Sequence, residues 1–388
     1  MEIGLVVYGS LDETSGGFRY DRQLVDYLRE RGDSVEVIAL PWTQFWAGLV
    51  DGISPAVTSQ LNRPVDVLVQ DELCFPSLWR QNHRLTNPGA VVTLVHLVQT
   101  DDRRGRFPQV SRWIERQYLD SVDGAICTSG STRRAAVELG EEFDESLVAP
   151  PAGRAEGPAC SETHVRQRAA ERPLRIVFVG NLLPRKDPVT LLSAVARLST
   201  NHDRGDWRLT VVGSHEADPA YASEVVETAT ALGIADRVEF TGEISDAELT
   251  ATLEASHVCC VPARYEGFGM VYLEAMEYGV VPIASARGGA GEFITDGVDG
   301  FLIAPGDTER IATLLSTLAA DREQLADLGA AALRTAVSHP SWDETLADVR
   351  SFLRYMSTNK ESPPIDRTAH PQETHLDPES NADRGESP

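Results

Sequence analysis

Apolar runs of strand length alternate with amphipathic helical stretches along the first 150 residues. This alternation is typical of a parallel sheet that is covered by helices. It predicts strands at residues 3–8, 35–40, 65–69, 91–97, 125–128 and 147–149. It also predicts helices at residues 18–31, 109–120 and 132–139. Residues 1–150 are therefore predicted to form a doubly wound α/β domain.

The same alternation restarts after a less regular, charged segment at residues 151–172, which is predicted to be an interdomain linker. The second series predicts strands at residues 174–179, 208–212, 238–241, 258–261, 281–285 and 301–303. Residues 173–338 are therefore predicted to form a second Rossmann-like domain. Two domains also fit the length of 388 residues, which exceeds what one hydrophobic core usually serves.

The end of the chain divides into a helix and a polar tail. Residues 339–356 place large apolar side chains at helical spacing, so this helix is expected to pack back across the domains. Residues 357–388 are rich in Pro, Ser, Asp and Glu and have almost no large apolar residues. Such a segment cannot bury enough surface to offset the entropy of ordering, which predicts a disordered acidic tail.

Charge limits the classes of partner. The net charge is -24 with a pI near 4.7, which argues against nucleic acid or anionic lipid held by bulk charge. Lysine occurs only at Lys186 and Lys360. This acidic, lysine-poor balance resembles that of proteins from salt-loving microbes, although a high-GC codon bias explains the lysine shortage equally well.

Cysteine and hydropathy patterns bear on the compartment. The five cysteines are odd in number and lack metal-ligand spacing, which favours buried thiols in a reducing compartment and no zinc site. No apolar run approaches the roughly 20 residues of a membrane span, and the first residues enter a strand pattern directly. A cytoplasmic protein without a transmembrane span is expected, with peripheral association at the inner membrane face left open.

The most informative segment is Glu266-Gly-Phe-Gly-Met-Val-Tyr-Leu-Glu274, directly after a predicted strand. If Gly267 and Gly269 form the turn that opens a helix, its backbone N–H groups face the strand ends, where open α/β sheets bind ligands. Carboxylates there accept hydrogen bonds from sugar or ribose hydroxyls. The alternative is structural: Glu266 caps the helix and Glu274 lies on a solvated face.

A second candidate is the loop from Val179 to Asp187 that ends the first strand of the second domain. It holds Arg185 and Lys186, two adjacent cations in an otherwise acidic protein, which indicates an anion site. Ordinary surface charge is the alternative. The loop also contains Asn181.

The first domain offers weaker signals. Gly16 and Gly17 stand between the first strand and the first long helix, where backbone N–H groups can approach a ligand, but a simple turn has the same appearance. His96 ends a predicted strand and would face a cleft there, or it is an ordinary core histidine. The aromatic residues Trp42, Phe45, Trp46, Phe75 and Trp79 either line an acceptor pocket or pack in the core.

The segment from Glu266 to Glu274 resembles the EX7E motif of family 4 glycosyltransferases (glycosyl transferases group 1). That resemblance implies a GT-B fold, with two Rossmann-like domains facing a cleft, and a retaining reaction. It implies that Glu266 contacts the donor sugar and that Glu274 binds the nucleotide ribose, with Gly267, Phe268 and Gly269 between them at the donor.

The resemblance extends to the other candidates. Lys186 matches the family's phosphate-binding lysine, while Asn181 stands where arginine is common and Asp187 replaces a glycine, so Arg185 is expected to supply the missing charge. Gly16 and Gly17 match the glycine loop at the donor diphosphate. His96 matches a family histidine near the donor sugar, although Leu97 stands where the family often has an acidic residue. Ile244 matches the loop at the nucleotide base. Residues 286–303 also match, with Glu292 as a helix cap.

The implied activity is that of a hexosyltransferase. Its donor would be a UDP- or GDP-sugar, and its acceptor a glycan, a lipid-linked molecule or a small molecule. No metal or other cofactor is expected. The alternatives are a nucleotide-sugar epimerase or a phosphorylase on the same fold, or a non-catalytic sugar-nucleotide binding subunit. An NAD enzyme is excluded because no GxGxxG follows the first strand.

Overall fold

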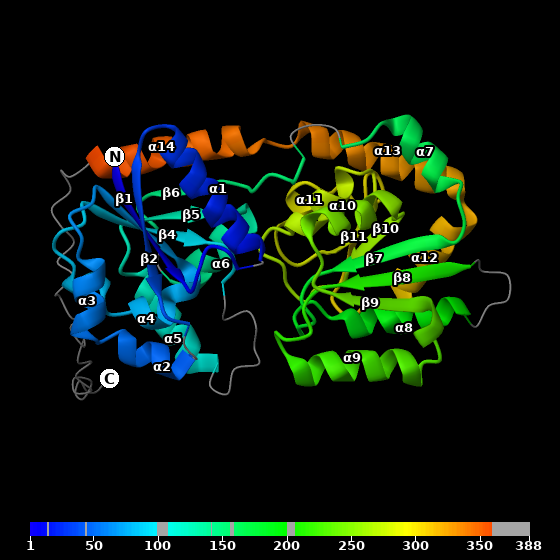
Figure 1. Cartoon of the computed structure of the whole chain (residues 1–388), viewed down its shortest axis with the longest axis horizontal. Helices are drawn as coiled ribbons and strands as arrows, with labels where there is room; N and C mark the ends of the chain where they lie inside the picture. Colours follow the sequence, from blue (N-terminus) through cyan, green and yellow to red (C-terminus); the bar gives the residue numbers. More distant parts are fainter. Residues whose placement is uncertain are drawn as a thin grey trace, which may run out of the picture.

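The computed structural model describes residues 1–13, 15–42, 45–98, 108–140, 142–155, 159–199 and 206–358. Their strands form two six-stranded parallel sheets (Figure 1), with orders β2-β1-β3-β4-β5-β6 and β12-β11-β10-β7-β8-β9. The first sheet comprises β1 (Glu2–Tyr8), β2 (Ser34–Leu40), β3 (Val67–Asp71), β4 (Ala90–Val95), β5 (Gly124–Cys127) and β6 (Ser146–Val148). The second comprises β7 (Leu174–Val179), β8 (Trp207–Val212), β9 (Val238–Gly242), β10 (Val258–Val261), β11 (Val281–Ser285) and β12 (Phe301–Ile303).

Helices cover both faces of the first sheet. Buried side chains of α1 (Gly16–Glu30) join one core cluster. The other cluster draws on α3 (Pro55–Leu61), α4 (Phe75–Leu78), α5 (Pro108–Leu119) and α6 (Gly130–Leu139). The short helix α2 packs outside α4; its bounds are Phe45–Asp51.

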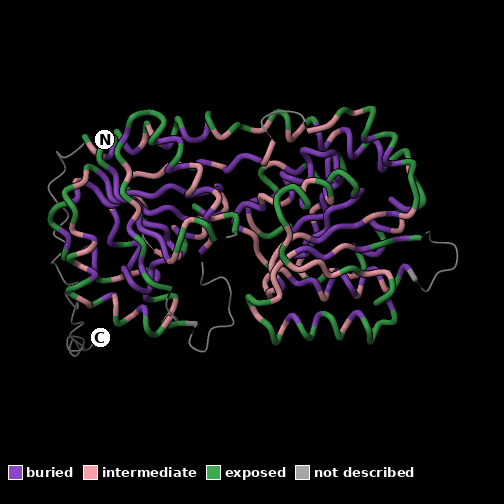
Figure 2. The backbone as a smooth tube through the Cα atoms, in the orientation of Figure 1, coloured by how far each residue is buried: buried purple, intermediate pink, exposed green. Residues whose placement is uncertain are grey.

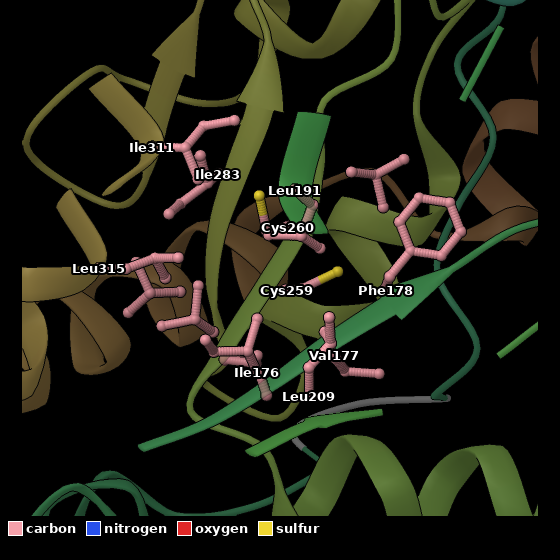
Figure 3. Close-up of a cluster of buried hydrophobic side chains, with 14 of the residues drawn as sticks. Ile176, Val177, Phe178, Leu191, Leu209, Cys259, Cys260, Ile283, Ile311 and Leu315 are labelled. Atoms are coloured by element: carbon pink, nitrogen blue, oxygen red, sulfur yellow. The ribbon is translucent and has the colours of Figure 1, made fainter. Parts of the chain in front are cut away.

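The second domain has one continuous core on its own sheet. Figure 3 shows side chains of β7, β8, β10 and β11 meeting those of α8 and α12, with Cys259 and Cys260 among them. All five cysteines are free thiols, and Cys160 alone among them is not buried. The helices are α8 (Pro188–Ser199), α9 (Pro219–Ala231), α10 (Asp246–Ala255), α11 (Met270–Met276), α12 (Thr308–Ala320) and α13 (Arg322–Ser338).

Two further helices pack on helices of the two domains. The helix α7 (Glu162–Ala169) forms inside the segment predicted as a linker, and Arg168 fixes it by donating to the carbonyl oxygens of Glu254, Tyr278 and Gly279. The second half of that segment is thus a packed part of the second domain. The helix α14 (Trp342–Thr358) returns to the first domain, where its apolar side packs beside α1.

These sheets confirm the predicted fold class: two doubly wound parallel-sheet domains with the GT-B arrangement. The inner strands are mostly buried, whereas the edge strands β2, β6 and β9 and the outer sides of the helices are partly or fully exposed (Figure 2). None of the helices in the described residues is long and apolar enough to cross a membrane. The predicted domain limits at residues 150 and 173 fall between β6 and β7. The predicted tail lies outside the described residues, except that residues 357 and 358 belong to α14.

Two strand ends differ from the prediction in a way that matters for the site. The strand β3 continues to Asp71, two residues beyond the predicted end, although its last two side chains are polar. The strand β4 stops at Val95, so His96 lies just after the strand rather than within it. Both residues therefore stand at carboxyl ends of neighbouring strands.

Candidate active site

Loops at the carboxyl ends of strands from both domains meet across the cleft. Ser129, which follows β5, donates through its hydroxyl to the carbonyl oxygen of Gly267, which follows β10, at 2.7 Å. The carboxylate of Glu292 accepts from the backbone N–H groups of Gly130 and Ser131 at 2.9 and 2.6 Å. It therefore caps the N-terminus of α6 from the other domain, where a negative charge is favoured. Glu292 is a helix cap, as predicted, but of a helix in the first domain.

Glu266 is held by the two cations that the sequence singles out. Its Oε2 lies 2.5 Å from Nζ of Lys186 and 3.5 Å from Nη1 of Arg185. Burial raises the pKa of Glu266, but the charges and hydrogen bonds of Lys186 and Arg185 outweigh it and hold that pKa below its usual value. Burial also lowers the pKa of Lys186, which the charge of Glu266 only partly offsets. The loop after β7 thus holds a mostly buried ion cluster.

The glycines after Glu266 let the backbone of the second domain come close to that of the first. A Cβ on Gly267 would lie 2.0 Å from the backbone oxygen of His96, so only glycine fits between the domains there. Gly269 has a φ of 96°, a left-handed conformation that favours glycine, and it is the N-cap of α11. The alternative in which Glu266 caps this helix is wrong. Phe268 is buried and stacks on Phe293 at 4.8 Å between ring centroids.

Glu274 is buried, so the alternative of a solvated face is wrong for it too. Its Oε1 lies 2.8 Å from Nη1 of Arg19 and 3.1 Å from Nε of Arg154. Arg19 comes from α1 of the first domain, and Arg154 from the segment between the sheets; Arg154 also pairs with Asp246 at 2.5 Å. The carboxylate therefore joins the two domains.

Sequence reasoning missed both of these arginines. Arg19 lies two residues after Gly17 at the start of α1, so its position beside the glycine loop was an available signal. Arg154 stands in an irregular segment without a motif, and nothing in the sequence indicated it.

The departures from the family pattern after β7 have structural explanations. Asp187, where a glycine is usual, takes a φ of 50° in the left-handed region, and its carboxylate lies 3.6 Å from Nε of Arg264. Asn181, where an arginine is usual, accepts from the backbone N–H of Ser214 through Oδ1 at 3.2 Å and so ties this loop to the one after β8. Asn181 thus serves loop structure and supplies no charge.

The first-domain wall begins with the glycine pair. Ser15 caps α1 by accepting from the N–H of Phe18, so Gly16 and Gly17 form the first turn of that helix. A Cβ on Gly17 would lie 3.2 Å from the ring of His96, and one on Gly16 would lie 3.2 Å from the sulfur of Met270. The pair therefore lies between His96 and α11 of the second domain.

Behind this pair, His96 belongs to a buried acidic group. Its Nε2 lies 3.2 Å from Oδ1 of Asp21, whose other carboxylate oxygen is buried without a hydrogen-bond partner among the described residues. Burial and the charge of Asp21 raise the pKa of Asp71 to about 7. Burial lowers the pKa of His96, but Asp21 and Asp71 outweigh it, and the net shift is upward. The sequence pattern that indicated His96, a polar residue at the end of an apolar run, could also have indicated Asp71.

Asp21, Asp71 and His96 each have one possible metal-ligating atom within 4.8 Å of those of the other two. They are the one such group of three among the described residues. By spacing alone this group could hold a divalent cation. The expectation that no metal is needed stays a prediction.

The remaining candidates divide by burial. Ile244 follows β9, and its half-buried side chain packs on the second core. Phe75 is buried and packs in the first core, as does the partly buried Trp79, whereas Trp42 and Trp46 are about half exposed. Core packing is thus confirmed for Phe75 and Trp79, and an acceptor pocket lined by the others stays a prediction.

Known proteins that resemble this chain are glycosyltransferases. Residues 161–335 match the family described as glycosyl transferases group 1. A similar protein is the GDP-mannose-dependent alpha-(1-6)-phosphatidylinositol monomannoside mannosyltransferase of Mycobacterium tuberculosis, 30% identical over 257 residues. That match covers 63% of this chain and 65% of the relative. A D-inositol 3-phosphate glycosyltransferase of Rhodococcus opacus is 34% identical over 185 residues, or 47% of this chain and 41% of the relative.

Solved structures agree in fold. Sucrose-phosphate synthase from Thermosynechococcus elongatus superimposes with a TM-score of 0.76 at 20% identity, covering 92% of this chain and 98% of that one. Anabaena HepE in complex with UDP and glucose gives 0.71 at 18% identity, covering 92% of this chain and all of that one. At such identities the likeness shows the fold alone.

Proposed function

On the premise that this chain is a member of the glycosyl transferases group 1 family, we propose that it is a hexosyltransferase. It moves a sugar from a nucleoside diphosphate sugar to an acceptor with retention of anomeric configuration. The observation that carries this proposal is the cluster of Glu266, Lys186 and Arg185 at the carboxyl end of the second sheet, opposite the glycine pair of α1.

In this proposal the donor diphosphate binds at the two cations. Lys186 and Arg185 now pair with Glu266, and phosphate oxygens would take over part of that pairing when the donor enters. From the opposite wall, the first turn of α1 presents backbone N–H groups and the positive end of its dipole. Negative charge grows on the diphosphate as the glycosidic bond breaks, so these preorganised charges lower the barrier.

The two glutamates would hold the sugar and the ribose. Released in part from Lys186, Glu266 accepts hydrogen bonds from sugar hydroxyls and orients the ring. Glu274 binds the ribose, which requires Arg19 or Arg154 to give up part of its pairing with that carboxylate. Ile244 lies on the loop proposed to touch the base. The acceptor attacks the same face that the diphosphate leaves, assisted by a departing phosphate oxygen.

Donor and acceptor are proposed as classes. The Mycobacterium tuberculosis relative is named for GDP-mannose, and the Anabaena structure holds UDP, so the donor is proposed to be a GDP- or UDP-sugar. The acceptor is a glycan, a lipid-linked molecule or a small molecule. Protein cations replace a metal in this scheme, and no other cofactor takes part.

The test measures release of nucleoside diphosphate from UDP-, GDP- and ADP-sugars, with and without candidate acceptors, at low and high salt. Glu266→Gln should reduce turnover about a thousandfold while nucleotide binding remains, because only orientation of the sugar is lost. Glu224→Gln, an exposed carboxylate on α9, is the matched control and should change nothing. Undiminished turnover in Glu266→Gln would refute this role.

The same experiment separates the rival activities. An epimerase would convert the donor sugar without an acceptor, and a phosphorylase would require inorganic phosphate. A non-catalytic subunit would bind one donor and turn over none with any acceptor.

A further inference from the structure

Arg19 brings a positive charge from the first domain to the proposed donor site of the second. It lies on α1, two residues after Gly17. Its Nη1 lies 2.8 Å from Oε1 of Glu274 on α11, and its Nη2 donates to the carbonyl oxygen of Gly153 at 3.4 Å. Both charged side chains are largely buried, with 17% of Arg19 and 7% of Glu274 exposed. The pair therefore joins the two domains (Figure 1) and is screened little by salt.

The second arginine on Glu274 is fixed to the second domain. Nε of Arg154 lies 3.1 Å from the same Oε1, and its Nη1 lies 2.5 Å from Oδ1 of Asp246 at the start of α10. The backbone N–H of Arg154 donates to the carboxylate of Glu277, directly after α11, at 2.8 Å. Because residues at both helices hold Arg154, it remains beside Glu274 when a ligand enters. Arg19, which comes from the other domain, is the partner that can leave.

A buried guanidinium that loses its carboxylate needs another anion. Burial lowers the pKa of Arg19, and the charge of Glu274 offsets only part of that effect. An unpaired charge in such surroundings is strongly destabilising. A ligand that displaces Arg19 must therefore do two things. It must supply donors to Glu274, and it must supply an anion to the guanidinium that it releases.

The other carboxylates near Arg19 are poor replacements for Glu274. Among the described residues, Asp246 and Glu277 are the other two whose negative charges act on Arg19. Asp246 already pairs with Arg154, and 90% of its side chain is exposed, so its charge is well solvated. Both oxygens of Glu277 accept backbone N–H groups, and burial raises the pKa of this carboxyl to about 7, so it is only partly ionised at neutral pH. A phosphate of the ligand is the better partner.

We propose that the donor exchanges the partners of Arg19: the ribose hydroxyls replace it on Glu274, and its guanidinium moves to the diphosphate of the same ligand. This inference rests on the proposed function, which places the ribose at Glu274 and the diphosphate at the first turn of α1. The positions suit the move. An added Cβ on Gly16 would lie 3.2 Å from the sulfur of Met270, which begins α11, and Glu274 follows about one turn later. Arg19 thus lies between the two parts of the ligand.

The exchange makes recognition of the two parts depend on each other. Two ribose hydroxyls can both donate to the carboxylate of Glu274, which compensates for the hydrogen bond that Arg19 gives up. A sugar without these hydroxyls has no donors to offer, so Arg19 stays on Glu274 and does not reach the diphosphate. Arg19 is in this way a specificity-determining residue that favours ribonucleotide donors, because a site built for hydroxyl groups rejects ligands that lack them.

The test is calorimetric titration of the full chain with UDP, GDP and ADP, and then with the 2′,3′-dideoxy form of the nucleotide that binds. Arg19→Gln should weaken binding of the ribose form about tenfold, because a charge-assisted contact with the diphosphate is lost. Binding of the dideoxy form should fall much less, so the two losses differ. Arg31→Gln, at the other end of α1 with 47% of its side chain exposed, is the matched control and should leave both affinities unchanged.

Thermal unfolding shows whether Arg19→Gln is folded. If it is not, Arg19→Lys, which keeps the charge, replaces it in the titrations, with a smaller loss that is again confined to the ribose form. Equal losses for the two forms would mean that Arg19 only shapes the cleft, and an undiminished affinity for the ribose form would likewise overturn the proposal. In both cases wild type still binds a nucleoside diphosphate, so the proposed function stands. If folded wild type binds none of the three nucleotides, both proposals are overturned.

Discussion

The two walls of the cleft handle buried carboxylates in different ways. On the second-domain wall, Glu266 is paired with Lys186 and Arg185, and Glu274 with arginines from elsewhere in the chain. Although burial raises the pKa of Glu266, its ion pairs hold that pKa below its usual value. They also place cations where, in the proposed reaction, a donor phosphate would exchange partners with a carboxylate.

On the first-domain wall, acidic groups are buried together with few cations. Asp21 and Asp71 lie near His96, and directly after Asp71 the buried Glu72 shares a hydrogen bond with Glu115. Burial raises the pKa of Asp71 to about 7 and that of Glu72 well above its ordinary value, and neighbouring carboxyl groups add to both shifts. The comparison teaches that one wall pairs its buried carboxylates with cations, whereas the other raises the pKa values of Asp71 and Glu72.

The largest effect is expected from a substitution that separates the two walls. Gly267→Ala would push a methyl group against the backbone of His96, so the domains must part. Turnover of the proposed reaction should fall at least about a hundredfold, since misplacing groups by even 1 Å has costs of that order. Small-angle scattering should show a larger radius of gyration than wild type.

The matched control is Gly291→Ala, in the short helical turn before Phe293. An added Cβ there would meet only Leu302 Cδ1, at the ordinary distance of 3.5 Å. It should leave both turnover and size unchanged. An unaltered radius of gyration and full turnover in Gly267→Ala would show that the walls do not depend on this contact.

The second domain should lose stability on the acid side. Burial lowers the pKa of His257 from 6.5 to about 4, and its ring accepts from the N–H of Arg175 and donates to the carbonyl of Arg168. The unfolded chain takes up this proton below 6.5, so the free energy of unfolding falls as pH drops from 6.5 toward 4, by up to about 3 kcal/mol. His257→Gln retains a donor and an acceptor, and its denaturant unfolding curves should change less over this range.

The first domain should lose stability in the opposite direction. Burial, and next the charge of Glu115, raise the pKa of Glu72 well above its ordinary 4.5. The unfolded chain releases this proton near 4.5, so the free energy of unfolding falls as pH rises above that value. Glu72→Gln keeps a neutral donor at every pH, and at pH 8 it should be more stable than wild type by roughly 1–3 kcal/mol. Equal slopes in the two proteins would remove Glu72 as the cause.

The smallest effect is expected at the joint between α14 and the first domain. Arg350 pairs with the buried Asp33 through Nε at 2.5 Å, and the amino terminus of Met1 pairs with the same carboxylate at 2.9 Å. Because the amino terminus remains, Arg350→Ala should lower the free energy of unfolding by only about 1 kcal/mol. Arg166→Ala, which removes an exposed pair with Asp327, should change it by less than about 0.5 kcal/mol. Equal losses in the two variants would contradict a special role for α14.

The sequence predicted the fold well because strands buried in a parallel sheet consist of apolar runs. The strands at 174–179, 258–261, 281–285 and 301–303 have the predicted bounds. It failed where polar residues extend a strand into the site, as at the end of β3, since pattern alone assigns Asp71 to a loop. It also missed α7, whose short, charged sequence has no strong apolar side.

The motifs of the site could be predicted from the sequence, but the ion pairs between their side chains could not. Glu266 and Lys186 were found separately, and folding brings them to 2.5 Å. Arg19 and Glu274 are 255 positions apart, and local spacing cannot indicate a contact between domains. The roles assigned to these residues in sugar transfer stay predictions.

The central claim is that the second-domain wall binds a nucleoside diphosphate sugar by exchanging the partners of Lys186. Calorimetric titration of wild type and Lys186→Ala with UDP-, GDP- and ADP-sugars, at high and low salt, tests it most directly. The account predicts micromolar binding of one donor class by wild type and a loss of about a hundredfold in the variant, or nearly 3 kcal/mol. No binding to any donor by the folded wild type, or equal affinity in the variant, would contradict it.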